Sequence, residues 1–183
     1  DNAMAKAAEK AVEGRKFKVI LGIDTSSSMQ GAIEKGKTTL GRVLPGFKDR
    51  PDDVFVVAFQ RTARQITFPA GGKDGKPAMG KTAIELALKG LEASGGTIYG
   101  SAIACAKDSG FKVADDEALI IMFIGDESDA DGRTGEDGTA LTTTIQALGY
   151  KPSAVVFLPH IGNMGRGQSV RGMAAKLQLP YTE

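Results

Sequence analysis

The sequence has almost none of the residues on which disulfides, zinc clusters and histidine-based catalysis depend. Cys105 is its one cysteine and His160 its one histidine. An intrachain disulfide is therefore excluded, and a lone histidine supplies neither a zinc cluster nor an obvious catalytic triad. Cys105 lies in the apolar stretch SAIACAKD, which is typical of a small core residue. His160 follows an expected strand, which favours a role in a loop or at a strand end.

Long apolar runs and an excess of charge are also missing. No run reaches the roughly 18 apolar residues that a membrane span requires, and the N-terminus has no signal-peptide core. The formal net charge is +1, and no block of lysine and arginine is interleaved with aromatics. We therefore expect no direct membrane insertion and no nucleic-acid partner. At 183 residues, of which 42% are hydrophobic and 25% charged, the chain suits one folded domain.

The first residues predict a boundary near residue 15. Met4, preceded by Asp1-Asn2-Ala3, resembles a start methionine behind vector-derived residues, and Met4–Val12 is expected to form a short leading helix. We therefore assign residues 1–15 to this remnant and helix, and residues 16–183 to the domain. A start methionine without a secretion signal favours a cytoplasmic protein.

Apolar runs and helical periodicities alternate along the chain. Strands are expected at Lys16–Ile23, Val54–Phe59, Gln65–Phe68, Ala118–Ile124 and Ala154–Leu158. Helices are expected at Met29–Leu44, Lys81–Leu91, Tyr99–Ser109, Thr139–Leu148 and Val170–Leu177. Strands separated by helices of this length predict an α/β fold, with a doubly wound, mainly parallel sheet of five to six strands flanked by helices on both faces.

The sequence also makes predictions for the two edges of this sheet. Arg61-Thr62-Ala63 permits a hairpin before Gln65–Phe68, so this short strand is expected to be an antiparallel edge. The last residues, LQLPYTE, lie where one more strand is due. We therefore expect the last strand of the domain to be missing or truncated.

A cluster of hydroxyls follows the first buried strand, in KVILGIDTSSSM at residues 18–29. Asp24, Ser26 and Ser28 stand at alternate positions, where the chain leaves the sheet and a helix is about to start. One carboxylate and two hydroxyls converging there form a hard oxygen site, which suits Mg²⁺ or Mn²⁺. A single serine would satisfy a helix N-cap, so the Asp-x-Ser-x-Ser spacing asks for more than a cap.

Two further loops carry matching residues at the ends of expected strands or before helices. Thr97 closes the SGGT loop, and Asp126 follows the strand ALIIMFI directly. In a parallel sheet such loops open at the carboxyl edge, where ligands bind near a topological switch point. The predicted metal site therefore consists of Asp24, Ser26, Ser28, Thr97 and Asp126. Two carboxylates and three hydroxyls suit a six-coordinate Mg²⁺ that retains some waters.

This set resembles the metal-ion-dependent adhesion site of von Willebrand factor A domains, also called integrin I-like domains. The resemblance covers nearly the whole chain, through Asp24-x-Ser26-x-Ser28, GGTIYGSAI around Thr97, and Asp126 after a hydrophobic strand. In that family the hydroxyls contact the metal, and the aspartates act directly or through water. The resemblance implies a six-stranded Rossmann-like sheet, Mg²⁺ or Mn²⁺ as cofactor and no enzymatic activity. It also implies a protein partner whose carboxylate fills an open coordination position.

The chain departs from that family after the final aspartate. The family usually has glycine there, whereas this chain has Glu127, and an acidic run continues with Ser128, Asp129 and Asp131. We expect a solvated acidic loop; altered metal affinity or a second cation is the alternative. Farther on, HIGNMGRGQSVR offers Arg166 and Arg171 as anion ligands, although a loop entering a helix explains them as well.

Two segments match the phosphate-loop pattern G-x-x-x-x-G-K-[ST] and support a competing interpretation. GAIEKGKT (31–38) falls inside an expected helix, after DTSSSMQ, whereas a phosphate loop must leave its strand directly. GKPAMGKT (75–82) precedes a helix, but PAGGKD separates it from the preceding strand and Pro77 lies within it. The enzyme alternative is thus a nucleotide hydrolase using Lys81 and Asp126. A third possibility is a passive scaffold whose metal only ties loops together.

Overall fold

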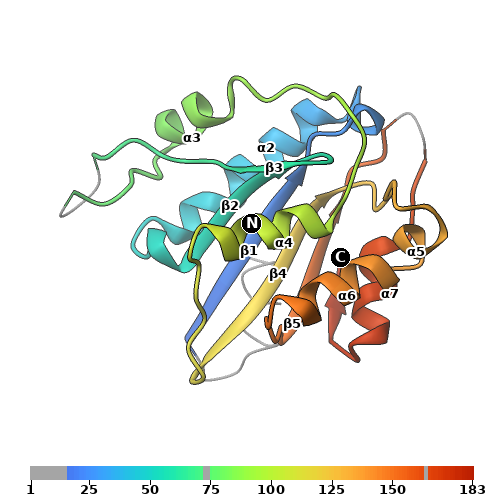
Figure 1. The fold of residues 1–183 in the computed structure, drawn as a ribbon. Helices are drawn as coiled ribbons and strands as arrows, with labels where there is room; N and C mark the ends of the chain where they lie inside the picture. Colours follow the sequence, from blue (N-terminus) through green and yellow to red (C-terminus); the bar gives the residue numbers. More distant parts are fainter. Residues whose placement is uncertain (1–15, 72–74, 163–164) are drawn as a thin grey trace.

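The computed structural model describes residues 16–71, 75–162 and 165–183, so the expected vector remnant and the helix Met4–Val12 lie outside it. Within these ranges the chain forms a six-stranded sheet in the order β3-β2-β1-β4-β5-β6 (Figure 1). Its strands are β1 (Lys16–Asp24), β2 (Val54–Phe59), β3 (Ala63–Gln65), β4 (Glu117–Gly125), β5 (Ala154–Pro159) and β6 (Tyr181–Thr182). Neighbouring strands pair in parallel except β2 and β3, which are antiparallel. The predicted doubly wound, mainly parallel sheet with a short antiparallel edge strand is confirmed.

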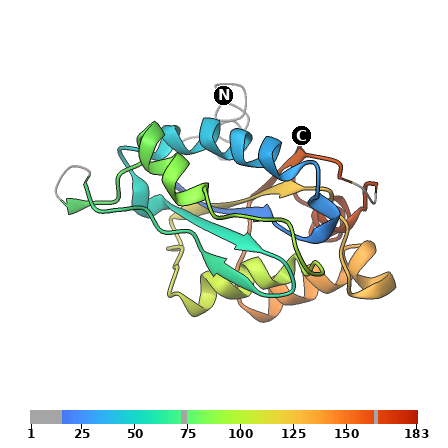
Figure 2. The same cartoon turned by 90° about the horizontal axis from the view of Figure 1, so that it is seen from above.

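Helices cover both faces of this sheet. They are α2 (Ile33–Val43), α3 (Lys81–Leu88), α4 (Gly100–Asp108), α5 (Gly132–Glu136), α6 (Thr139–Ala147) and α7 (Ser169–Lys176). Figure 2 shows α2 and α3 above the sheet and α4 and α6 below it. Because successive strand residues point to opposite faces, β1 supplies Val19 and Leu21 to the core under α2 and Ile20 to the core on α4 and α6.

The central strand β1 owes its continuous apolar run to burial on both faces between β2 and β4. Its one glycine, Gly22, is required by close packing. A Cβ at this position would lie 2.9 Å from the ring of Phe123 and 3.1 Å from the ring of Phe59. These two rings pack edge to face, with their centroids 5.5 Å apart. The glycine therefore lets an aromatic cluster lie directly against the centre of the sheet.

Several elements differ from their expected bounds, and two of these differences have a clear structural cause. The helix expected at Met29–Leu44 begins only at Ile33, after the 3-10 turn η1 (Ser27–Met29) and Gly31, whose φ is +86°. This left-handed conformation interrupts the helix, and glycine adopts it without strain. The edge strand β3 begins two residues and ends three residues earlier than the expected Gln65–Phe68, because a tight hairpin pairs Ala63 with Phe59.

The other sheet edge is formed by β6, where a missing or truncated strand was expected. Its two residues pair with β5 through Tyr181 opposite Val155 and Thr182 opposite Val156. The sheet is thereby extended by one short strand beside the first half of β5. This places Tyr181 close to the loop that follows β4, as described below.

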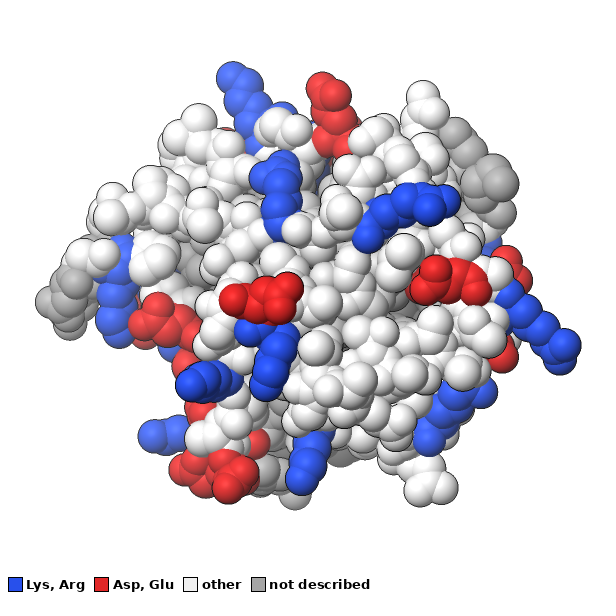
Figure 3. Space-filling view, in the orientation of Figure 1, with Lys and Arg blue, Asp and Glu red and all other residues white. Residues whose placement is uncertain are grey.

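The outer surface carries mixed charge. Among the helices of the described residues, none has the length and apolar character needed to cross a membrane. On the face seen in Figure 3, lysine and arginine side chains are interspersed with aspartate and glutamate. This mixture matches the formal net charge of +1.

Candidate metal centre

Two aspartates meet at the carboxyl edge of the sheet. Asp24 ends β1 and Asp126 follows β4, and these strands are neighbours at the point where the strand order reverses. Both side chains are fully buried. The intervening Gly125 leaves room for this approach, since a Cβ there would lie 2.8 Å from the Cβ of Asp24. The structure thus places both predicted carboxylates at the topological switch point, where such sheets bind ligands.

The hydroxyl residues after Asp24 alternate between two roles. Thr25 and Ser27 anchor the loop: their hydroxyls donate to the carbonyl oxygens of Phe59 and Gly95, at 3.1 Å and 2.8 Å. Ser26 instead makes contacts with Asp24 and with Ser28. The Ser26 N–H donates to Asp24 Oδ1 at 2.8 Å, and the Ser26 and Ser28 Oγ atoms are 2.8 Å apart. Ser26 thus contacts Asp24 directly, and Ser28 is linked to Asp24 through Ser26.

Backbone hydrogen bonds hold the loop of Thr97 against the same place. The N–H of Ser27 donates to the Gly95 oxygen at 2.9 Å, and the N–H of Ser94 donates to the Thr25 oxygen at 2.8 Å. Thr97 itself is buried, and its carbonyl accepts the N–H of Ala130 at 2.7 Å. Because Ala130 belongs to the loop after Asp126, all three predicted loops are tied together by main-chain contacts.

One oxygen in this arrangement has no partner. Asp126 Oδ1 accepts the N–H of Ser128 at 3.0 Å, whereas Asp126 Oδ2 is the one buried side-chain oxygen or nitrogen of the described residues without a hydrogen bond. A buried carboxylate oxygen without a donor is unfavourable, and such groups call for an explanation such as an ion. Nowhere in residues 16–71, 75–162 and 165–183 do three His, Cys, Asp or Glu side chains form a metal-binding group. Hydroxyls would therefore have to complete the shell around the two aspartates, and serine and threonine oxygens suit a hard cation.

The surroundings of Asp24 disfavour its charged form. Burial raises the pKa of Asp24 to about 7 from 3.8, and the negative charge of Asp126 adds to this shift, while hydrogen bonds from Ser26 oppose it. A divalent cation bound beside Asp24 would oppose both effects, because a positive charge favours the ionised carboxylate.

This pKa gives the metal-free protein a defined pH dependence. Between pH 3.8 and about 7 the unfolded chain has released the Asp24 proton while the folded protein retains it. The folded state then binds more protons, so the Asp24 contribution to the free energy of unfolding falls as the pH rises through this window. We expect urea unfolding in EDTA to show this loss, and Asp24→Asn to flatten it. Equal pH slopes in the two proteins would contradict the prediction.

Tyr99 joins the two halves of the site, a role that no sequence pattern indicated. Its side chain is fully buried. Its hydroxyl donates to Asp24 Oδ2 at 3.4 Å and accepts the N–H of Glu127 at 2.9 Å. Burial, and then the charges of Asp24 and Asp126, raise the pKa of the phenol above its usual value. The phenol therefore keeps the proton that it donates toward Asp24.

Glu127 is not solvated, contrary to the expected acidic loop. Its side chain is fully buried and accepts two hydrogen bonds from Arg166, at 2.7 Å from Nη2 and 3.1 Å from Nε. The backbone N–H of Arg171, in the first turn of α7, donates to Oε2 at 2.9 Å, and its Nε lies 3.3 Å from Oε1. The Tyr181 hydroxyl lies 3.3 Å from Oε1. The two arginines considered as anion ligands thus bind a carboxylate of this chain.

The rest of the acidic run divides between the interior and the surface. Asp129 is buried and accepts the N–H groups of Tyr99 and Asp131, at 3.1 Å and 2.9 Å. Burial raises its pKa. The prediction of a solvated loop is therefore wrong for Glu127 and Asp129, whereas Asp131 is exposed. Sequence spacing could not reveal these pairings, because the arginines that bind Glu127 follow it by about 40 residues.

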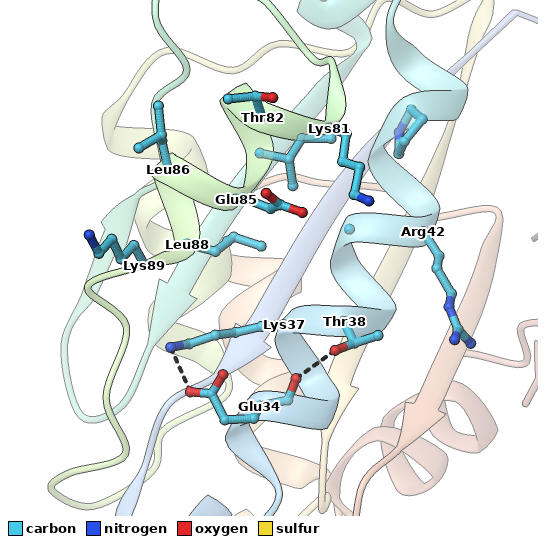
Figure 4. Close-up of a pocket in the computed structure, with 13 residues that line it drawn as sticks. Glu34, Lys37, Thr38, Arg42, Lys81, Thr82, Glu85, Leu86, Leu88 and Lys89 are labelled. Carbon is cyan, nitrogen blue, oxygen red and sulfur yellow. Dashed lines mark hydrogen bonds and ion pairs between the residues drawn. The ribbon is translucent and has the colours of Figure 1, made fainter.

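A groove of about 800 Å³ lies between α2 and α3, away from the two aspartates (Figure 4). Its lining includes Lys37-Thr38 and Lys81-Thr82, the ends of both phosphate-loop matches. The first match lies largely within α2, whose interior backbone N–H groups are used by the helix. Lys81 lies beside the C-terminal half of α2, near Arg42. Lys81 lines this groove, whereas Asp126 follows β4 at the carboxyl edge and is not part of the lining, so the two residues of the hydrolase alternative do not share one pocket.

Comparisons with known proteins show a likeness of fold. No protein-family model and no curated protein matches this sequence. The structure is similar to the conserved hypothetical protein BatB from Bacteroides thetaiotaomicron, with a TM-score of 0.58 and 17% identity over 91% of this chain and 89% of that one. A von Willebrand factor type A protein from Catenulispora acidiphila gives 0.58 and 20% identity, over 92% of this chain and 39% of that one. Manganese-loaded TRAP protein from Plasmodium vivax gives 0.61 and 13% identity, over 88% and 63%.

Proposed function

Since this chain has the von Willebrand factor A fold, we propose that it is a divalent-metal-dependent protein interaction domain. In this proposal Mg²⁺ or Mn²⁺ binds at the carboxyl edge of the sheet and captures an acidic residue of a partner protein. The ligands are Asp24, Ser26, Ser28, Thr97 and Asp126. The observation that carries the proposal is the buried, unpartnered Oδ2 of Asp126 beside a second buried carboxylate. The manganese carried by the TRAP protein of the same fold supports it.

The charge balance of the site explains why a partner would supply a carboxylate. Asp24 and Asp126 carry two negative charges when ionised, and the three hydroxyl residues are neutral. The two carboxylates neutralise a bound divalent cation without adding surplus negative charge. The cation can therefore still attract a further carboxylate. Ser28 is half-buried, so the site borders solvent on this side. An arriving carboxylate would meet partly desolvated surroundings, where charge attraction is stronger than in water.

The proposal involves binding and no chemical step. His160, the one histidine, is held by a 2.8 Å contact between its Nε2 and the Thr39 hydroxyl, and burial lowers its pKa. Each aspartate is held by a backbone hydrogen bond. The N–H two residues further along the chain donates to Oδ1, in Asp24 as in Asp126. Such bonds orient ligands before the cation arrives.

The test combines calorimetry with peptide selection. We expect the protein to bind Mn²⁺ and Mg²⁺ by calorimetry, and to select short random peptides that contain aspartate or glutamate when Mg²⁺ is present. Replacing that acid in a selected peptide with its amide, or adding EDTA, should abolish binding. Peptide binding that survives both changes would contradict metal-mediated capture. Cation binding without acid-dependent peptides would favour the scaffold with a purely structural metal.

A further inference from the structure

Tyr99 lies behind the proposed ligands and is not one of them. We propose that Tyr99 is a positioning residue, whose hydroxyl fixes Asp24 and the loop of Asp126 relative to each other for cation binding. This rests on the proposed metal-binding function. It goes beyond the five predicted ligands, because the residue that aligns them is a buried tyrosine outside that set.

The hydroxyl of Tyr99 connects the two aspartate-bearing segments. It accepts the N–H of Glu127, the residue after Asp126, at 2.9 Å, and its proton points toward Asp24 Oδ2 at 3.4 Å. The first bond has ordinary length, while the second is long for an O–H···O bond. One side chain thus touches the carboxylate at the end of β1 and the main chain just beyond β4. A shift of either segment would change one of the two contacts.

The ring of Tyr99 is fixed by its surroundings. It packs edge to face on Phe59 and Phe123, with centroid distances of 4.8 Å and 4.9 Å. Its backbone N–H donates to Asp129 Oδ2 at 3.1 Å, which ties α4 to the loop after β4 a second time. A buried aromatic ring with two such neighbours has little freedom to rotate. The position of the Tyr99 hydroxyl is therefore fixed by the packing of its ring and by this backbone bond.

Gly125 makes this approach possible. A Cβ at Gly125 would lie 2.6 Å from the Tyr99 hydroxyl oxygen and 3.2 Å from Asp24 Oδ2. The phenol, the Asp24 carboxylate and the Gly125 backbone therefore share one small space directly before Asp126. Groups that orient the ligands of a metal typically change its affinity by about 10–100-fold when removed.

The decisive variant is Tyr99→Phe, which removes the hydroxyl and keeps the ring. We expect Mn²⁺ affinity, measured by calorimetry, to fall about tenfold. Tyr150→Phe is the matched control, since its hydroxyl donates to the Phe111 oxygen at 2.6 Å, far from the ligands in sequence. A merely structural role would lower the stability of Tyr99→Phe equally with and without Mn²⁺. A positioning role makes the loss of thermal stability larger when Mn²⁺ is present.

A second measurement uses the unmutated protein, so it does not depend on the variant folding. The chain has three tyrosines, and labelling with an isotope at tyrosine Cζ gives one NMR signal for each. Saturating Mg²⁺ should shift the Tyr99 signal and leave that of Tyr150 in place. An unmoved Tyr99 signal, or Mn²⁺ affinity within about twofold of the original in Tyr99→Phe, overturns the positioning role while metal binding stands. Failure of the unmutated protein to bind Mn²⁺ or Mg²⁺ overturns the proposed function, and the positioning role with it.

Discussion

Asp24→Ala is expected to lower the affinity for Mg²⁺ and Mn²⁺ by at least about 100-fold, because it removes a ligand, and even groups behind the ligands change affinity by about 10–100-fold. Capture of acidic peptides should disappear with it. The fold should persist, since the replaced carboxylate is a buried group whose charge is disfavoured: burial raises its pKa to about 7. Calorimetry measures the affinity, and circular dichroism in EDTA checks the fold.

The matched control is Asp131→Ala, which removes an exposed acid from the loop after β4. Its affinity should stay within about twofold of the original, because an exposed carboxylate outside the ligand set adds only screened attraction. Asp24→Asn separates charge from shape, since its amide oxygen can still accept the Ser26 N–H. Unchanged Mg²⁺ affinity in Asp24→Ala would show that Asp24 is not a ligand and would contradict a site built on Asp24 and Asp126.

Arg166→Met is expected to lower the free energy of unfolding by about 2–4 kcal/mol, because it leaves a buried carboxylate short of its main cation. Glu127 is fully buried, and Arg166 gives it two of its hydrogen bonds. Methionine retains an apolar stem where the guanidinium now lies over the ring of Phe157. Urea unfolding in EDTA measures the loss independently of any cation.

Two comparisons identify the cause of that loss. Arg133→Met replaces an exposed arginine of α5 and should change stability by at most about 0.5 kcal/mol. Combining Arg166→Met with Glu127→Gln should recover part of the loss, because the unpaired charge is then absent. If the double variant is as unstable as the sum of its parts, the ion pair is not the source of the effect.

The sheet and the convergence of the site could be predicted because both follow from local patterns. Central strands of a parallel sheet are apolar on both faces, so Val54–Phe59 was predicted with the bounds that the structure shows. Polar residues directly after such strands must lie at one edge of the sheet. That argument alone placed Asp24 and Asp126 near each other, without any knowledge of their contacts.

Helix boundaries were harder, because apolar spacing does not distinguish a 3-10 turn from the first turn of a helix. Met29 is fully buried, as the predicted helix required, yet it belongs to η1. The interruption comes from backbone conformation at Gly31 rather than from side-chain pattern. Sequence periodicity reports which residues are buried, and it does not report the main-chain angles between them.

Glu127 shows a different limit. Its φ is +61°, a left-handed conformation that glycine adopts freely and that other residues adopt with strain. Glu127 therefore stands at a backbone position that suits the glycine of the family that the sequence resembles. Here the contacts of the Glu127 side chain with Arg166 and Arg171, which are distant in sequence, offset the cost of this backbone conformation. The resemblance to that family marked the departure, but only the fold revealed what the carboxylate binds.

The pairing of β1 with β4 sets the order in which this molecule can assemble. Lys16 lies opposite Glu117 and Ile23 opposite Ile124, so the partners are separated by 101 residues in the chain. Closing such a long loop is entropically slow, and mainly parallel sheets fold slowly for this reason. Asp24 and Asp126 can meet only after that closure. A ligand held between them would therefore prolong the lifetime of the folded state rather than speed its formation.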